Sequence, residues 1–408
     1  MRTDLADLYR DLHRHPELSF AETRTAGIAA ARLRDAGYEV TEGVGRTGVV
    51  GVLRNGAGPT ALLRADMDAL PVAEDTGLDY ASTARGTAPD GDDTAVAHAC
   101  GHDMHVSCLV GAAAELAAAR GTWSGILLVV FQPAEETGGG ARAMLDDDLY
   151  GRFGTPDVVL GQHVAPLPAG VLAVTPGPAF AGSDTVRVWL HGSGGHGSRP
   201  ETTVDPVLMA ATTVLRLQTV VSREVPAAET AVLSVGLLRA GSKENVIPDS
   251  AELGLTVRSY TPAVRDRVLG AVERIVRGEA ATSGAPRDPE IRVTESFPPV
   301  CNDADAVERT RGALATVAAL PVVDPGPVTG SEDVGAFAVA AGAPCVYWLL
   351  GGADPASFEG CSDVERIRER VADLPSNHSP RYAPVIEPTL STGVAALVAA
   401  AREWLPTG

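Results

Sequence analysis

The stretch His98-Ala-Cys-Gly-His-Asp-Met-His105 is the densest group of side chains able to do chemistry. It holds three histidines, one cysteine and one aspartate in a chain with nine His and five Cys in all. Thiolate and imidazole are ligands for divalent first-row metals, and a sulfur donor favours zinc without excluding manganese, cobalt or nickel. The stretch therefore predicts part of a metal site, and other segments must supply the remaining ligands.

Three further segments deliver carboxylates or imidazoles directly after apolar runs of strand length. They are 60–65 before Asp66 and Asp68, 126–131 before Glu135 and Glu136, and 158–161 before His163. Strands that alternate with helices form a largely parallel sheet, and such sheets bind ligands outside the carboxyl ends of their strands. We therefore expect one metal site built from Cys100, His102, Glu136, His163 and His378.

Spacing alone does not choose the ligands. His98 and His102, or His102 and His105, would also share a helix face. For any one histidine taken alone, a hydrogen-bonded structural role is the alternative. The grouping at strand ends favours metal binding over that alternative.

The vicinal pair Glu135-Glu136 follows a buried strand and a proline. Adjacent side chains diverge, so one carboxylate can bind metal while the other faces a reacting water. A solvated acidic turn is the alternative, which the buried strand before it disfavours. Asp66 and Asp68 are expected to orient metal-bound groups.

The loop Gly192-Ser-Gly-Gly-His196-Gly-Ser-Arg-Pro200 displays a histidine among glycines. A phosphate-binding loop would need a strand–GxxxxGK–helix context, which is missing here. A plain turn is the second alternative. We interpret His196 as an electrophile that closes on a substrate.

Asn245 and Arg258 are candidates for holding a substrate carboxylate, because they offer an amide donor and a bidentate fork. Surface roles are equally consistent with these two residues. The segment Gly330-Ser-Glu332-Asp333 precedes a helix and is typical of an N-cap.

The elements around these residues predict two domains of different type. Helical repeats and apolar runs alternate up to about residue 181, with an irregular loop over 75–97 and a helix over 104–119. Between 182 and 296 the order β-α-β-β-α-β is that of a ferredoxin-like unit. The chain then returns to α/β patterns, so we expect a catalytic domain of 1–181 and 297–408 that carries an inserted domain.

Composition limits the partners. The 408 residues are too many for one ordinary core. Lys+Arg 33 against Asp+Glu 52 gives a net charge of −19, which repels nucleic acid and anionic membranes. Five scattered cysteines do not form a disulfide framework, the start lacks a signal-like apolar region, and no apolar run spans a membrane. We expect a cytoplasmic protein.

Seven motifs together resemble the M20 metallopeptidase superfamily, and in particular its amidohydrolase branch of hippurate hydrolases, N-acyl-amino-acid deacylases and auxin-conjugate hydrolases. They are RADMDALP (64–71), HACGHDMH (98–105), Glu135-Glu136, GGHGSRP (194–200), NVIP (245–248), GSEDV (330–334) and HSP (378–380). The opening LHRHPELSF (12–20) also resembles that branch, so the similarity covers nearly the whole chain.

This resemblance implies an α/β catalytic domain with two divalent metal ions and an inserted lid domain that forms a homodimer. Zinc or manganese is expected, with cobalt and nickel as alternatives. Metal ligands, by motif position, are Cys100, His102, Glu136, His163 and His378. Glu135 matches the general base, and His196 matches a lid histidine that polarises the substrate carbonyl, often from the partner subunit.

The role of Asp66 is undetermined, and the residue at position 201 differs from the family pattern. Other branches have His at the position of Asp66, so its role is open, while Asp68 is expected to act beside the metals and is grouped with the catalytic residues. Glu201 replaces a His that is frequent in this branch, which leaves the acyl preference undetermined.

The expected reaction is hydrolysis of the amide bond of an N-acyl amino acid or a similar small conjugate. A dipeptidase or exopeptidase of the same superfamily is the alternative. A silent metal-binding scaffold is disfavoured by the intact Glu135. A thiol-redox protein using Cys100 and Cys108 is disfavoured by the lack of a CxxC motif.

Overall fold

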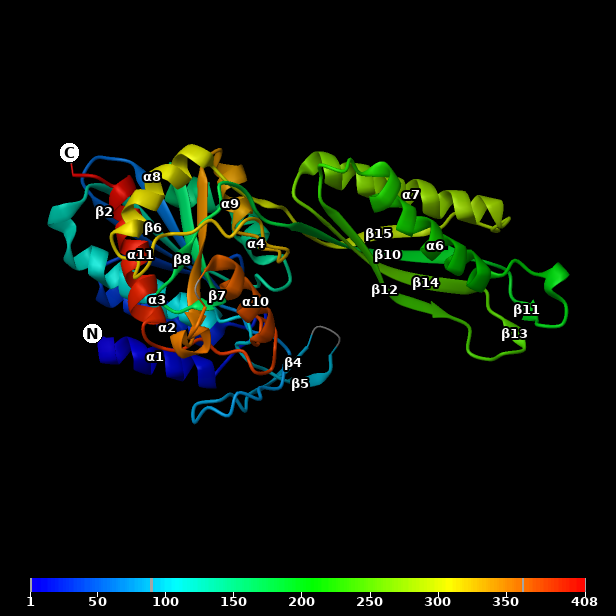
Figure 1. Ribbon diagram of the computed structural model, residues 1–408, viewed down its shortest axis with the longest axis horizontal. Helices are drawn as coiled ribbons and strands as arrows, with labels where there is room; N and C mark the ends of the chain where they lie inside the picture. Colours follow the sequence, from blue (N-terminus) through cyan, green and yellow to red (C-terminus); the bar gives the residue numbers. More distant parts are fainter. Residues whose placement is uncertain (1, 89–90, 362, 408) are drawn as a thin grey trace. The chain divides into compact units, whose positions relative to one another are not determined.

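The computed structural model describes residues 2–88, 91–361 and 363–407, which form two compact units. Unit 1 is formed by the chain up to Ala179, Cys301–Pro327 and the chain from Asp333 onwards (Figure 1). Unit 2 is formed by Phe180–Val300 and Val328–Glu332. The last of these segments was expected in the catalytic domain, but it belongs with the inserted part of the chain.

The centre of unit 1 is a seven-stranded sheet with the order β1-β2-β6-β3-β7-β17-β8. Its strands are β1 (Glu39–Val44), β2 (Gly48–Asn55), β3 (Thr60–Asp66), β6 (Gly125–Gln132), β7 (Val158–Pro168), β8 (Leu172–Ala173) and β17 (Cys345–Ala353). β3 pairs in parallel with β6 and β7, and β17 pairs in parallel with β7. The prediction of an α/β fold with a mostly parallel central sheet is confirmed.

Burial explains the apolar runs in the sequence. β6 (GILLVVFQ) is buried at every residue except Ile126, because helices cover both of its faces.

The helices of unit 1 are α1 (Arg2–Arg14), α2 (Thr23–Asp35), α3 (His102–Ala118), α4 (Gly140–Asp146), α5 (Leu149–Phe153), α8 (Ala304–Ala315), α9 (Gly335–Ala341), α10 (Val364–Asp373) and α11 (Thr389–Trp404). α3 and α11 pack against each other and against β3 and β7. α4 and α9 also contact each other, and α4 contacts β6 while α9 contacts β7.

Two local expectations for unit 1 were wrong. α3 begins at His102 rather than at 104, because Gly101 (φ +86°) turns the chain directly into the helix and so puts His102 in the first turn. The segment 75–97 was expected to be irregular, but it contains the short hairpin β4 (Arg85–Thr87) and β5 (Asp93–Ala95).

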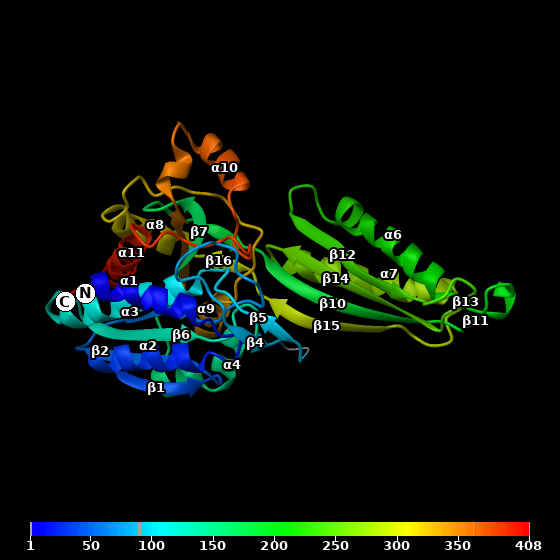
Figure 2. The ribbon, with the colours of Figure 1, turned by 90° about the horizontal axis from the view of Figure 1, so that it is seen from below.

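Unit 2 contains a four-stranded antiparallel sheet with the order β12-β14-β10-β15. Its elements are β10 (Gly182–His191), α6 (Pro206–Glu224), β12 (Ala231–Ala240), β14 (Ser250–Ser259), α7 (Pro262–Thr282) and β15 (Glu290–Phe297). α6 and α7 contact each other and β14, so they cover one face of the sheet (Figure 2). The β-α-β-β-α-β order is that of a ferredoxin-like unit.

The core of unit 2 follows the strand and helix periodicities. Leu253, Leu255 and Val257 of β14 alternate inward and pack against Val268 and Val272, which lie four residues apart on α7. Within the described residues no helix is both long enough and apolar enough to cross a membrane.

Candidate metal centre

The predicted ligands meet at the edge of the sheet where β3 and β6 end, level with the middle of the adjacent parallel strand β7. β3 runs into Asp66 and Asp68, β6 runs into Glu135 and Glu136, and β7 carries His163. Neighbouring parallel strands end at the same edge of a sheet, so these side chains are brought together from positions about a hundred residues apart.

Two overlapping triplets of ligand atoms form at this edge. The ligand atoms of Cys100, His102 and His163 lie within 4.8 Å of one another, as do those of Cys100, Glu136 and His378. Cys100 Sγ lies 3.5 Å from His163 Nε2, and His378 Nε2 lies 3.3 Å from Glu136 Oε2. All five predicted ligands are therefore close together, and the sulfur atom is common to both triplets. We call these five residues the ligand cluster.

Two buried atoms of the ligand cluster indicate that a cation fits there. His102 Nε2 and Glu136 Oε1 are 3.7 Å apart, and neither has a hydrogen-bond partner among the described residues. Buried polar atoms are normally satisfied, and an imidazole nitrogen facing a carboxylate oxygen is a suitable donor pair for a divalent metal.

Electrostatics in the ligand cluster point the same way. Burial raises the pKa of the Glu136 carboxyl to about 7, despite the nearby His102. Burial also raises the pKa of the Cys100 thiol well above its ordinary value. A bound cation would favour the charged form of both groups, so their burial is costly without one.

Asp68 holds His102 and the acidic pair in position. The His102 ring contacts the Asp68 carbonyl oxygen through Nδ1 at 2.8 Å, which directs Nε2 towards Glu136. The Asp68 carboxylate accepts hydrogen bonds from the backbone amides of Glu135 and Glu136, each at 3.0 Å. Such contacts behind the ligands fix their orientation.

Asn377, which the sequence analysis did not single out, joins three of the ligand-bearing segments. Its Nδ2 donates to the carbonyl oxygens of Cys100 at 3.0 Å and Val164 at 3.1 Å. The next residue, His378, has φ +73° and donates its backbone N–H to the Ala99 carbonyl at 2.7 Å. The only available signal was its position next to His378.

Asp66 and His105 belong to a buried network beside the ligand cluster. Asp66 pairs with Arg64 at 2.8 Å and with His105 Nδ1 at 2.5 Å. Burial alone would raise the pKa of Asp66, but the charges of Arg64, His102 and His105 hold this pKa well below its usual range. His105 Nε2 accepts the Val164 N–H at 2.8 Å, so both of its ring nitrogens have protein partners.

The expectation that Gly330–Asp333 caps a helix was wrong. α9 has Val334 at its N-cap and no side-chain cap. The Asp333 carboxylate instead accepts hydrogen bonds from Arg64 at 3.1 Å, Gln132 at 2.7 Å and the backbone N–H of Ala141 at 3.1 Å. Asp333 thereby helps to neutralise the buried guanidinium of Arg64 on β3.

The other predicted residues lie in unit 2. His196 is exposed in the short strand β11 (Gly195–His196), which pairs with β13 (Val246–Ile247), and Asn245 accepts the Gly197 N–H at 2.8 Å through its carbonyl oxygen. Arg258 lies near the end of β14, where it donates to the Thr329 carbonyl at 2.7 Å. Unit 2 therefore brings His196 and Asn245 together at one end, while a ten-residue strand of about 30 Å separates that end from Arg258.

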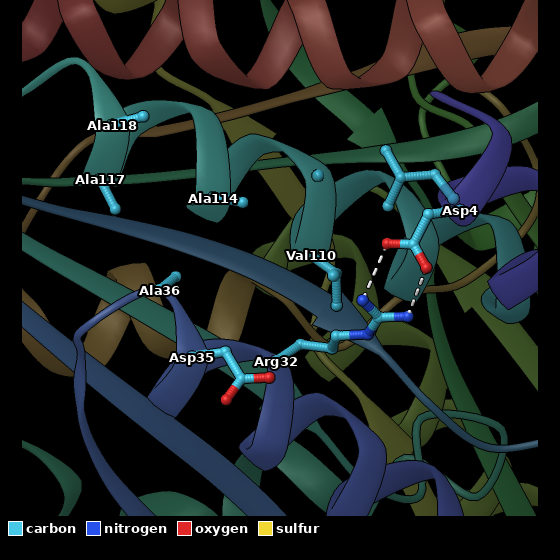
Figure 3. A pocket seen from close by; sticks show the side chains of 10 residues that line it. Asp4, Arg32, Asp35, Ala36, Val110, Ala114, Ala117 and Ala118 are labelled. Carbon is cyan, nitrogen blue, oxygen red and sulfur yellow. Dashed lines mark hydrogen bonds and ion pairs between the residues drawn. The ribbon is translucent and has the colours of Figure 1, made fainter. Parts of the chain in front are cut away.

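A groove elsewhere in unit 1 has carboxylates but no imidazole or thiol in its lining. It has a volume of about 410 Å³, lies between α1, α2 and α3, and is crossed by the Arg32–Asp4 ion pair at 2.8 Å (Figure 3). Its lining from α3 starts at Val110, about 12 Å along the helix from His102. No histidine or cysteine lines it, so the ligand cluster remains the candidate site.

Three curated relatives are similar to most of this chain. Thermostable carboxypeptidase 1 of Saccharolobus solfataricus is 36% identical over 353 residues, 85% of each chain. N-acetyl-L-cysteine deacetylase of Bacillus subtilis is 35% identical over 335 residues, 82% of this chain and 77% of its own. Hippurate hydrolase of Campylobacter jejuni is 38% identical over 312 residues, 76% of this chain and 77% of its own.

Solved structures and a family model agree with these relatives. A protein of methicillin resistant Staphylococcus aureus has a TM-score of 0.83 at 29% identity and covers 99% of this chain and 97% of its own. YXEP of Bacillus subtilis, described as a dinuclear metal binding peptidase from the M20 family, has a TM-score of 0.76 at 28% identity, with 98% of each chain covered. The model of peptidase family M20/M25/M40 matches residues 62–375. The chain therefore belongs to peptidase family M20/M25/M40.

Proposed function

We propose that this protein is a metal-dependent amidohydrolase that cleaves N-acyl amino acids, or similar small N-acyl conjugates, to a carboxylic acid and a free amino acid. The observation that carries this proposal is the pair of ligand triplets sharing Cys100 beside a buried glutamate that belongs to neither triplet. The names of the deacetylase and hippurate hydrolase relatives support the substrate class.

The proposed cofactor is a pair of divalent ions, zinc or manganese, with cobalt and nickel as alternatives. Cys100, His102 and His163 would hold one ion, and Cys100, Glu136 and His378 the other. When bound, two such ions lower the pKa of a water towards neutrality and polarise a carbonyl oxygen. The description of the YXEP protein as dinuclear supports the number of ions.

Glu135 is the proposed general base. It is buried, and its carboxylate lies within 4.8 Å of the ligand atoms of His102 and Glu136. It would take a proton from the attacking water and pass it to the leaving amine, a contribution of about 10²–10⁴ in rate. Asp68 keeps this carboxylate in place through the backbone amide of Glu135.

His196 is the proposed donor to the developing oxyanion, while Asn245 and Arg258 would bind the substrate carboxylate. Their distribution at opposite ends of unit 2 supports a homodimer in which the His196 end of one subunit serves the site of another. Exposed apolar side chains of unit 2 support the same assembly. Leu208 and Leu215 on α6 are 63% and 72% exposed, and Leu238 on the edge strand β12 is 50% exposed.

A second candidate function is cleavage of peptides from the carboxyl end. The carboxypeptidase relative, at 36% identity over 85% of the chain, favours it. The two functions differ in whether the acyl half of the substrate carries a free amine, which would need an acidic contact.

The deciding experiment compares N-acetyl, N-benzoyl and long-chain N-acyl amino acids with dipeptides that carry a free amine. We expect turnover of the N-acyl substrates that is lost with a chelator and restored by Zn²⁺ or Mn²⁺. Preferential cleavage of the dipeptides would favour the second function. Turnover that survives verified metal removal would contradict both.

A further inference from the structure

The turn that carries Glu135 and Glu136 has a costly backbone conformation. Ala134, fully buried, has φ +47°, a left-handed conformation that an alanine rarely adopts. Such a conformation persists only where surrounding contacts hold it, and it is found preferentially at functional sites. The contacts that hold it come from a segment more than a hundred residues earlier in the chain.

Glu22 makes the first of these contacts. Its Oε1 accepts the backbone N–H of Ala134 at 2.8 Å and that of Phe20 at 2.8 Å, while its Oε2 accepts the Thr47 hydroxyl at 2.5 Å. Glu22 is fully buried, and among the described residues no cation forms an ion pair with it. A buried carboxylate satisfied only by neutral donors is expensive, and here its oxygen fixes the strained residue directly.

Ser19 supports the same turn indirectly, through Asp68. Its hydroxyl donates to Asp68 Oδ2 at 2.6 Å, and this same oxygen accepts the N–H of Glu136 at 3.0 Å. The two segments also pair through the backbone, because Ala69 donates its N–H to the Glu17 carbonyl at 2.8 Å. Ser19 therefore restrains the rotation of the carboxylate that holds the acidic pair.

We propose that Ser19 and Glu22 are positioning residues that fix the turn bearing Glu135 and Glu136. They act through hydrogen bonds, Glu22 on the Ala134 amide and Ser19 on the Asp68 carboxylate. The segment Glu17–Glu22 thus belongs to the catalytic apparatus of unit 1, although it carries none of the reacting groups. This inference rests on the proposed function for the role of Glu135, but the positioning itself is a statement about geometry.

The test compares Ser19→Ala and Glu22→Ala with three reference variants. Ser82→Ala removes a half-buried hydroxyl that donates to Val96 and does not touch the turn. Ser19→Thr restores the donor to Asp68. Glu22→Gln keeps an oxygen for the two backbone amides and loses only the charge.

We expect Ser19→Ala and Glu22→Ala to lower kcat about 10–100-fold with little change in KM, as for other groups that orient reacting residues. Ser82→Ala should match the wild type, and Ser19→Thr and Glu22→Gln should recover most of the rate. A rate for Glu22→Gln as low as that for Glu22→Ala would overturn the positioning role of Glu22, because charge rather than hydrogen bonding would then be decisive.

A second readout does not depend on turnover. In Co²⁺-substituted protein, the visible absorption bands should change in Ser19→Ala and Glu22→Ala, because the Glu136 carboxylate moves, and should stay as in the wild type in Ser82→Ala. Unchanged bands together with unchanged kcat in folded Ser19→Ala would overturn the inference, even if Glu22→Ala does not fold. If the wild type cleaves none of the amide substrates, the proposed function fails, while the cobalt spectra still decide the positioning.

Discussion

The ligand cluster in unit 1 and the His196 end of unit 2 present histidines in opposite ways. In the ligand cluster, His102 and His163 each contact a backbone carbonyl through Nδ1, at 2.8 Å in both cases, which leaves Nε2 for another partner. His196 is exposed, and within the described part of the chain its Nδ1 contacts Ser198, two residues away, and no other residue. The contacts in the ligand cluster restrain the rings of His102 and His163. The ring of His196 is restrained only by a residue of its own loop.

This difference follows from what each histidine is proposed to do. A metal ligand binds in its deprotonated form and gains from being oriented in advance, which for His102 and His163 is provided by contacts with backbone carbonyls. A group that contacts the substrate only in the transition state must be able to move towards it. The glycines on both sides of His196 give the backbone the freedom for this movement. The predictions below test this contrast, in order of decreasing expected effect.

Glu135→Gln should give the largest loss. The carboxamide cannot accept the proton of the attacking water, so kcat should fall about 10²–10⁴-fold, while metal content by elemental analysis stays as in the wild type. Glu229→Gln, at an exposed position in unit 2 with no proposed role, is the control and should leave kcat within about twofold. More than about a tenth of wild-type kcat in Glu135→Gln would remove Glu135 from this role.

His196→Ala should lower kcat about 10²–10³-fold, the usual cost of losing one oxyanion donor, and should leave metal content unchanged. His191→Ala, at a half-buried histidine of the same unit, is the control. A parallel loss of metal in His196→Ala would mean that this end of unit 2 helps to hold the ions, and would break the contrast between the two regions.

Mixing the two inactive proteins sharpens the second prediction. If His196 acts on the site of a partner subunit, a heterodimer of His196→Ala and Glu135→Gln has one site with both groups intact. Part of the activity should then return after subunit exchange. Verified exchange without recovery would favour a contact within one chain.

Cys100→Ala should weaken metal binding about tenfold or more, because both ligand triplets lose their common sulfur. Cys108→Ala is the matched control, since this thiol is also buried but lies outside the ligand cluster and donates to the Leu390 carbonyl at 3.8 Å. Equal metal affinities in both variants would show that the ligand set has been assigned wrongly.

The smallest expected effect concerns the support of the helix that bears His102. Burial alone would lower the pKa of His13, but Asp103 at 2.6 Å and Glu74 at 3.1 Å raise it to about 10. A raised pKa stabilises the folded state fully below about pH 6.5 and loses this contribution as the pH rises towards 10.

In metal-free protein, urea unfolding should therefore show a His13 contribution that falls by at most about 3 kcal/mol between pH 7 and 9.5. His13→Gln should flatten this part of the pH dependence, whereas His15→Gln, at an exposed position, should not. An equally steep loss of stability in His13→Gln would assign the effect to other groups.

Local pattern was sufficient to predict much of this protein. Apolar runs and helical spacing predicted the strands that precede Asp68 and Glu135, because burial dictates residue type along an element. The run 158–161 predicted the start of β7, but that strand continues past His163 to Pro168. Strands that alternate with helices then predicted a common edge for their polar ends. The resemblance to the family motifs assigned all five members of the ligand cluster, including His378, which follows no predicted strand, and the structure brings their ligand atoms close together.

Tertiary structure alone decided which polar side chains support that site. Asp333 looked like a helix cap, but it binds Arg64, which lies 269 residues earlier in the chain. Asn377 and Glu22 lie outside the motifs, and Ser19 lies in the family-like opening without a role that the motif indicates, since each acts through a hydrogen bond to a distant backbone or side chain. Periodicity records which face of an element is buried, whereas the partner of a buried polar group is set only when distant segments pack together.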